Sequence, residues 1–432
     1  MHRPSSRSVT EVLRTRWIYA AVALAVLVRL AVLWIVIHHP DRAMTPDSPL
    51  YLDLGRHFHE AYVLAETEHL GGSVLRTPGY PLFCYALFTV FGDGMTPILV
   101  TQNILSLVSV AIVFVLALQL AGPAAAGWAA LVAVMDPLSI TYSNQIRNEV
   151  LFTAVVALSV LQWHRSLRRP SAVSVVTTGL LFAVATLVRP VTTYLILFLV
   201  PADIWLRYRG AGRAAMTVWL VVGFLVPLGG WAARNSSLTG AAVISSVESE
   251  NLLYQRAAGA IAEETRQTRV IVAERLRVET GTPPVGAVTA GETFKSDEAL
   301  ALRLLLQHPY GALMSTMRGM GRLLVGPGTT SFTEVTTGGR ANGFVVRWLL
   351  AGYLAIMYLG VTIGVVGLVG RRLREPLVVV GVVLVYLVLI SSGPEAYSRF
   401  RAPVMPLFAV LAGIGLANRS RREPRTPLDA RR

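Results

Sequence analysis

Two polar stretches follow the first apolar run of the chain: Thr-Pro-Asp-Ser-Pro-Leu-Tyr at residues 45–51 and Arg-Thr-Pro-Gly-Tyr-Pro at residues 76–81. They place a carboxylate, Asp47, and a guanidinium, Arg76, beside proline-fixed turns close to apolar segments. A charged group next to a membrane core is costly unless it is solvated or paired. We therefore expect these stretches to form a functional site, and the remaining chain to be a membrane scaffold that positions it.

The composition is that of a membrane protein. Of the 432 residues, 53% are hydrophobic and only 15% are charged. A soluble domain of this composition would expose large apolar patches. The apolar residues recur in runs close to membrane-spanning length, so the sequence predicts an all-α polytopic membrane protein.

The net charge of +14 does not indicate a nucleic-acid partner. The arginines fall in short clusters between apolar runs, without a basic helix or a groove of interleaved basic and aromatic residues. Such clusters are the topology signal of a membrane protein. Cys84 is the only cysteine, which excludes an internal disulfide and any multi-cysteine zinc or iron–sulfur site.

Ten apolar segments are candidates for membrane spans. The connectors between them alternate in basicity, and placing every basic cluster in the cytoplasm satisfies the positive-inside rule, with both termini inside. The run 80–91 has about 12 residues, roughly 18 Å as a helix against a core of about 30 Å. We interpret it as a juxtamembrane or re-entrant helix within an outer loop, 38–97. The predicted spans are 17–37, 98–120, 124–143, 149–163, 171–188, 190–206, 214–232, 343–369, 376–392 and 402–417.

The spans divide the chain into two membrane modules separated by a second long outer loop. Within that loop, amphipathic helices are expected at 251–279 and 295–307, and a basic amphipathic stretch continues to Leu324. In order, the predicted parts are a basic cytoplasmic segment 1–16, a seven-span catalytic module 17–232, the outer loop 233–342, a three-span module 343–417 and a basic cytoplasmic tail 418–432.

Asp47 is a candidate general base. Pro46 and Pro49 restrict the backbone around it and present its side chain from a turn. A base that takes a proton from an attacking hydroxyl contributes about 10²–10⁴-fold to the rate. The ordinary alternative is an Asx turn or an N-cap for a helix at 49–60. Tyr51 lies on that helix, where it could contact a substrate or simply pack.

Arginines on the outer side form the second part of the predicted site. Arg76 suits an anionic leaving group, because a guanidinium aimed at the departing phosphate stabilises its charge. Arg189 lies between two spans on the outer side, where positive-inside bias disfavours arginine. Arg399 and Arg401 form another outer cluster beside Glu395. A lipid phosphate would need such a cluster; bulk headgroup contacts, or an ion pair between Arg401 and Glu395, are the structural alternatives.

Glu149 opens the fourth predicted span from the outer side, with Arg147 two residues earlier. Its role is either substrate positioning or favourable charge at a helix N-terminus. His57 and His59 lie two apart on a predicted helix and point to different faces, so they do not chelate as a pair. The histidines of the first outer loop, which include His69, allow a divalent metal. We nevertheless expect neither a metal nor another cofactor. The absence of a Gly-rich phosphate loop argues against a nucleotide-sugar donor.

Together these motifs resemble the GT-C glycosyltransferases, specifically the branch of protein O-mannosyltransferases and lipid A aminoarabinose transferases. The resemblance is strongest over 17–190. One departure is Ser48, which follows Asp47 where the family usually has two adjacent acids. The motifs are Asp47 with Tyr51, the Arg-x-Pro-x-Tyr-Pro box that contains Arg76 and Tyr80, the segment from Asp136-Pro137 to Arg147-Asn148-Glu149, and Arg-Phe-Arg-Ala-Pro-Val-Met-Pro at 399–406.

The resemblance implies a GT-C-like integral membrane glycosyltransferase, a hexosyl or pentosyl transferase, that uses a polyprenyl-phosphate-linked sugar. Transfer would occur on the extracytoplasmic side of a bacterial plasma membrane, to a glycan, lipid or protein acceptor, under a lid formed by the loop 233–342. Asp47 would be the base. The donor phosphate would be bound by Arg76, Arg189, Arg399 and Arg401, and substrates would be positioned by Tyr51, Tyr80, Arg147 and Glu149.

Two other functions stay open. A secondary transporter of anionic or lipid-linked substrates would have paired halves with broken helices at corresponding positions, and none is evident. A cell-wall glycan polymerase or ligase would also take lipid-linked sugars, but with outer-loop arginines and histidines in place of an acid. Replacing Asp47 with Asn would leave either activity intact, whereas a base-dependent transferase would lose about two to four orders of magnitude.

Overall fold

The computed structural model describes residues 16–211, 214–281, 291–370 and 374–420. Every regular element in these ranges is helical, and they contain no β-strand. The all-α class predicted from the sequence is therefore confirmed. Residues 1–15 and 421–432, which make up most of the two predicted basic terminal segments, lie outside the described residues.

Within the part of the chain that the structure describes, six helical segments are long and apolar enough to cross a membrane. They are α6 (Met95–Ala121), α9 (Glu149–Arg168), Pro190–Tyr208 in η3 (Pro190–Leu195) and α11 (Ile196–Ala211), Ala214–Thr239 in η4 (Ala214–Met216) and α12 (Thr217–Thr239), Gly343–Val369 in α19 (Gly343–Gly370), and Ser398–Ala417 in η6 (Ser398–Val404) and α21 (Met405–Ser420).

Five shorter apolar helices accompany them, and they include the run that we interpreted as juxtamembrane. With the six long segments they account for all ten predicted spans. The multi-pass membrane character is thus confirmed, while the count of ten stays a prediction. The shorter helices are Val22–His38 in α2 (Arg16–His38), α5 (Gly79–Phe91), α7 (Pro123–Val134), α10 (Ala172–Val188) and Glu375–Ile390 in α20 (Arg374–Ile390).

One predicted span, 124–143, is broken in the structure. It consists of α7 and a short helix, α8 (Pro137–Tyr142), because a proline disfavours helical backbone at the residue before it. Asp136 caps α8, accepting hydrogen bonds from the backbone N–H groups of Leu138 at 3.2 Å and Ser139 at 3.0 Å. The break leads into residues 141–150, all of them buried, which end at the start of α9.

The last apolar helix, α21, is the most buried of the six long segments. It packs between α7 and α19 at glycine positions, and small residues let membrane helices approach closely. A Cβ atom at Gly413 would collide with the carbonyl oxygen of Ala125 on α7, and one at Gly415 with that of Gly360 on α19. This tight fit fixes α21 and the 3-10 segment η6 that precedes it.

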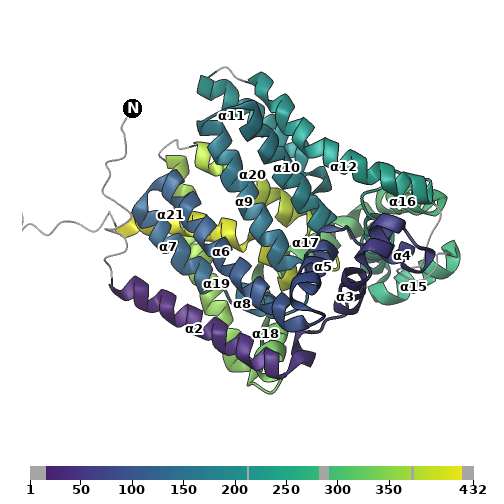
Figure 1. Cartoon of the computed structure of the whole chain (residues 1–432), viewed down its shortest axis with the longest axis horizontal. Helices are drawn as coiled ribbons and strands as arrows, with labels where there is room; N and C mark the ends of the chain where they lie inside the picture. Colours follow the sequence, from purple (N-terminus) through teal and green to yellow (C-terminus); the bar gives the residue numbers. More distant parts are fainter. Residues whose placement is uncertain (1–15, 212–213, 282–290, 371–373, 421–432) are drawn as a thin grey trace, which may run out of the picture.

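Toward the right of Figure 1 lie α3, α4, α15 and α16, which belong to the two loops that the sequence predicts to be outer loops. The loops contact each other: Ser245 Oγ donates to the carbonyl oxygen of Leu75 at 2.5 Å. The first loop contains η1 (Pro40–Ala43), α3 (Ser48–Arg56), the π-helix η2 (His59–Leu64) and α4 (Thr67–Leu75). The second contains α13 (Val247–Asn251), the π-helix η5 (Leu252–Ala257), α14 (Ala258–Thr265), α15 (Arg269–Thr280), α16 (Gly291–Gln307), α17 (Pro309–Val325) and α18 (Thr329–Thr337).

The amphipathic helices predicted at 251–279 and 295–307 are confirmed by η5, α14, α15 and α16. The turn predicted between them, from Gly281 to Pro284, falls mostly outside the described residues. The division of the chain into two modules and a lid stays a prediction.

Candidate functional site

Asp47 occupies the N-cap position of α3, but its side chain does not cap that helix. Its two carboxylate oxygens bind guanidinium groups from distant segments instead. Oδ1 accepts a hydrogen bond from Nη2 of Arg76 at 2.7 Å, and Oδ2 accepts one from Nη2 of Arg399 at 3.0 Å. The Asp47 side chain remains 22% exposed. Side-chain capping, the ordinary alternative for Asp47, is therefore not what the structure shows.

Glu149 is the first residue of α9, and its side chain is almost completely buried. Oε1 accepts a hydrogen bond from Nη1 of Arg189 at 3.2 Å and another from Nε of Arg399. Arg399 thus bridges the two carboxylates, with Nε donating to Glu149 and Nη2 donating to Asp47. Within the described residues, Oε2 of Glu149 has no hydrogen-bond partner.

These residues form an ionic cluster: Asp47, Arg76, Glu149, Arg189 and Arg399. They come from five segments that the fold brings to one place: the turns before α3 and after α4, the start of α9, the turn before η3, and η6. The cluster contains three guanidiniums and two carboxylates, so it has an excess of one positive charge. All five residues were predicted site residues, and convergence of Asp47, Glu149 and the arginines was expected.

Aromatic and amide side chains surround the ionic cluster. The Arg76 guanidinium lies 5.2 Å from the centre of the Tyr51 ring, and that of Arg189 lies 5.2 Å from the Phe400 ring. Asn148 Nδ2 donates to the Tyr51 hydroxyl at 3.0 Å. These contacts place aromatic rings beside the guanidiniums, whose N–H groups bind the carboxylates. Asn148 and Phe400 had no assigned role in the sequence, although each adjoins a predicted site residue.

Tyr80 lies one layer further from the ionic cluster than Tyr51. Its ring packs edge-on against Tyr51 at 4.8 Å between ring centres, and its hydroxyl donates to Oε1 of Gln102 at 2.8 Å. Tyr80 therefore supports Tyr51. Arg147 is buried near both carboxylates, and its charge favours the ionised form of Asp47.

Arg401 is not brought to the ionic cluster, contrary to its predicted role in phosphate binding. The side chain is completely buried, and Nη1 donates to the carbonyl oxygens of Leu323 at 2.7 Å and Leu324 at 2.8 Å near the end of α17. The suggested ion pair between Arg401 and Glu395 is not formed among the described residues. Oε1 of Glu395 instead lies 4.0 Å from Nη2 of Arg256. Arg401 satisfies carbonyl groups at a helix C-terminus, which is a structural role.

The electrostatics of the ionic cluster keep Asp47 ionised. Burial alone would raise the pKa of its carboxyl group, but the guanidiniums of Arg76 and Arg399 hold that pKa below its usual value of 3.8. A carboxylate held by two guanidiniums is a weak base, because each of them stabilises the charged form. Asp47 can therefore act as an effective base only if these pairings loosen.

A groove of about 730 Å³ lies between α14, α15 and α17 in the second outer loop. Its lining is polar and includes Glu263, Arg266, Arg269, Tyr310 and Arg322. Arg322 also donates to the carbonyl oxygens of Pro394 at 2.8 Å and Ala396 at 3.1 Å, in the loop that leads to Arg399. The groove is therefore connected to the ionic cluster through a short segment. No sequence signal could have revealed it, because its residues come from separate helices.

Part of the ionic cluster lies in a segment that is similar to a known family. Residues 76–231 match the family model described as dolichyl-phosphate-mannose-protein mannosyltransferase. This segment contains Arg76, Glu149 and Arg189, whereas Asp47 and Arg399 lie outside it. No curated protein is significantly similar to the chain in sequence.

Two solved structures similar to this chain are those of ArnT from Cupriavidus metallidurans. The structure bound to undecaprenyl phosphate shares 15% identity, covering 93% of this chain and 78% of ArnT with a TM-score of 0.41. The apo structure shares 14% identity over the same fractions with a TM-score of 0.37. The family match agrees with the resemblance stated from the motifs: residues 76–231 are similar to a family of mannosyltransferases.

Proposed function

We propose that the protein transfers a sugar from a polyprenyl-phosphate donor to an acceptor on the outer side of the membrane. The ionic cluster would bind the donor phosphate, and Asp47 would be the general base. One observation carries this proposal: five segments converge to place two carboxylates and three guanidiniums in direct contact, with Asp47 still partly exposed.

The charge of the ionic cluster suits this donor. The phosphodiester of a polyprenyl-phosphate sugar has one negative charge, which the excess positive charge of the cluster balances. When the bond between the sugar and the phosphate breaks, the leaving phosphate gains further negative charge. Guanidiniums already aimed at that position stabilise this charge as it develops, and paired N–H donors match phosphate oxygens geometrically.

Binding of the donor would also activate the base. Arg76 and Arg399 hold the two oxygens of Asp47, and a phosphate that binds the same guanidiniums competes with that carboxylate. Glu149 keeps Arg189 and Arg399 in place because it is buried behind them. Asp47, loosened from its partners, would then take the proton of the acceptor hydroxyl. The acceptor oxygen would attack the anomeric carbon as the polyprenyl phosphate leaves, with inversion of configuration.

The direction of α9 supports an outer location. Glu149 begins this helix, and Arg165 and Arg168 lie in its last turn. A helix of 20 residues is about 30 Å long, which is the thickness of the hydrocarbon core. Because basic residues are concentrated on the cytoplasmic side, the end with Glu149 would face outward.

The acceptor would approach from the second outer loop. Its polar groove of about 730 Å³ is large enough for a sugar or phosphate headgroup, and its lining combines carboxylates, guanidiniums and Tyr310. Arg322 joins this groove to the segment before Arg399. This arrangement supports the loop 233–342 as the lid over the acceptor, which we retain as part of the proposal.

The test is transfer by the purified full chain in lipid nanodiscs, supplied with a panel of polyprenyl-phosphate sugars and membrane-lipid or glycan acceptors, with release of polyprenyl phosphate as the readout. Asp47→Asn should lower the rate by about 10²–10⁴-fold. Asp41→Asn is the matched control, because Asp41 is an exposed acid in the same loop and should leave the rate unchanged. Full activity of Asp47→Asn would overturn the proposal, and so would uptake of labelled substrate without transfer when the chain is reconstituted in sealed lipid vesicles.

A further inference from the structure

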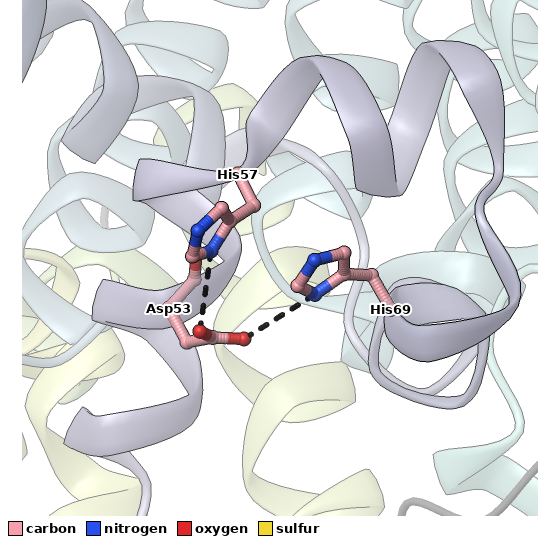
Figure 2. Close-up of side chains that lie close together, drawn as sticks. All are labelled: Asp53, His57 and His69. Atoms are coloured by element: carbon pink, nitrogen blue, oxygen red, sulfur yellow. Dashed lines mark hydrogen bonds and ion pairs between the residues drawn. The ribbon is translucent and has the colours of Figure 1, made fainter.

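A second group of polar side chains lies on the same two outer-loop helices that lead to Asp47 and Arg76. Asp53 on α3, His57 at the end of α3 and His69 on α4 point toward one another (Figure 2). One potential ligand atom from each of them lies within 4.8 Å of the other two. The group is separate from the ionic cluster and has no part in the proposed reaction.

The distances within this group match the spacing of metal ligands better than that of strong hydrogen bonds. Nδ1 of His57 lies 3.3 Å from Oδ1 of Asp53, and Nδ1 of His69 lies 3.6 Å from Oδ2. Charge-assisted hydrogen bonds are usually about 2.7–2.9 Å long. Ligands placed about 2.1 Å from a tetrahedral ion are roughly 3.4 Å apart, which is close to the distances observed.

The two imidazole rings lie close to each other and to the same carboxylate. They stack with 4.7 Å between ring centres and 18° between their planes, and both present Nδ1 to the same carboxylate (Figure 2). The side chains of Asp53 and His57 are 48% and 46% exposed, while that of His69 is 11% exposed. An ion could therefore enter from solvent and keep a water molecule as its fourth ligand.

We propose that Asp53, His57 and His69 bind one divalent transition-metal ion. Two imidazole nitrogens and one carboxylate oxygen are typical ligands of Zn²⁺, which is the best match. The ion would link α3 to α4, whose connection passes through Ala65 in a left-handed conformation with φ of 56°. A non-glycine residue adopts this conformation only at a cost, so the connection alone does not favour the arrangement of the two helices.

The link has a consequence for the ionic cluster, and this part of the inference rests on the proposed function. Asp47 lies six residues before Asp53, and Arg76 lies seven residues after His69. The ion would thus sit about two helical turns, roughly 10 Å, from the Asp47–Arg76 pair. It would touch neither substrate, so Asp53, His57 and His69 are positioning residues that fix α3 against α4 and hence Asp47 against Arg76.

The test begins with the full chain purified without a polyhistidine tag, stripped of metal and titrated with Zn²⁺ alone, and with Co²⁺ as a spectroscopic probe. We expect one equivalent to bind, a Co²⁺ absorption band typical of tetrahedral coordination, and a higher melting temperature with Zn²⁺. His69→Ala should weaken binding by at least about tenfold and abolish the rise in melting temperature. His59→Ala is the matched control, because His59 is exposed, lies near the group and is not one of its three members.

The outcomes separate the metal site from the proposed function. Failure of the native chain to bind Zn²⁺ or Co²⁺, or equal binding by His69→Ala, overturns the site whether or not the protein transfers sugar. If the metal binds but its removal leaves the KM for the donor unchanged in a chain that transfers sugar, the positioning role is overturned. A rise in that KM with little change in kcat, reversed by adding Zn²⁺, supports the positioning role. If the native chain transfers no sugar, metal binding still tests the site itself.

Discussion

The two ends of α9 each contact a buried group of charges, and these groups differ in a way that separates function from structure. At the far end from Glu149, Asp203 and Arg207 of α11 form an ion pair with a distance of 2.7 Å between Oδ2 and Nε. Trp163 donates to Oδ1 of Asp203 at 2.8 Å, and Thr217 donates to Oδ2 at 2.6 Å. Arg207 also donates to Ser166 through both of its terminal nitrogens.

The Asp203 group is balanced in charge, fully buried at Asp203 and satisfied at both carboxylate oxygens. The ionic cluster has an excess positive charge, partly exposed members and a carboxylate oxygen, Oε2 of Glu149, without a partner among the described residues. A structural ion pair has no need of a further anion, whereas the ionic cluster has the charge to accept one. The comparison teaches that the two groups differ in charge balance more than in burial, and this difference is why the proposed function is placed at the Glu149 end of α9.

The largest expected effect is on stability, at the Asp203 end. Asp203→Ala would leave the Arg207 guanidinium buried without its carboxylate, and breaking a buried pair in this way costs about 3–5 kcal/mol of unfolding free energy. The measurement is the unfolding free energy of the chain in bilayers, together with donor kinetics of the folded fraction. Those kinetics should remain within threefold of native values. If Asp203→Ala is as stable as the native chain but has lost sugar transfer, the Asp203 end of α9 would be the functional one and the Glu149 end the structural one.

The next effect is on activity, at the Glu149 end. Arg399→Gln removes the bridge between Asp47 and Glu149, and loss of one group that stabilises transition-state charge lowers kcat by about 10²–10³-fold. We expect this loss in donor turnover, with a smaller change in melting temperature than for Asp203→Ala. Arg340→Gln is the control, because Arg340 is an exposed arginine in the second outer loop. A native turnover rate in Arg399→Gln would show that the ionic cluster is only structural.

The smallest effect concerns pH. The pKa of Asp47 lies below 3.8 in the free protein, so its ion pairs stabilise the fold fully above about pH 4 and lose this contribution only as pH falls through the lowered pKa. The ratio kcat/KM, which reports the free enzyme, should therefore show no acid limb from Asp47 above pH 4.5. The value of kcat reports the donor complex, where the phosphate competes for Arg76 and Arg399, and its acid limb should lie at a higher pH. If kcat and kcat/KM fall over the same acidic pH range, binding of the donor does not activate the base.

The sequence was sufficient for the fold class and for most of the ionic cluster, because both depend on local signals. Apolar runs predicted the helices, and proline-fixed turns with isolated outer charges singled out Asp47, Arg76, Arg189, Glu149 and Arg399. Arg401 was assigned wrongly to the same site. It lies two residues from Arg399 within η6, where neighbouring side chains point in different directions, and only the packing against α17 shows where each one goes.

The histidine group and the groove depend on contacts that sequence spacing does not reveal. His57 was compared with His59, its neighbour along the chain, whereas the structure pairs it with His69 on another helix. The groove likewise requires α14 and α17 to lie side by side, and Gly311 permits this by placing its backbone against Ala260. The break at Asp136 had a local signal, the following proline, which the length of the apolar run obscured.

The bridging position of Arg399 also constrains the order in which the protein can be built. Its guanidinium is synthesised about 250 residues after Glu149 and just ahead of the tightly packed α21. Until Arg399 is synthesised, the nascent chain has two acids and only two of their three basic partners, so the ionic cluster is incomplete. The complete ionic cluster therefore forms only once η6 has taken its place in the bundle.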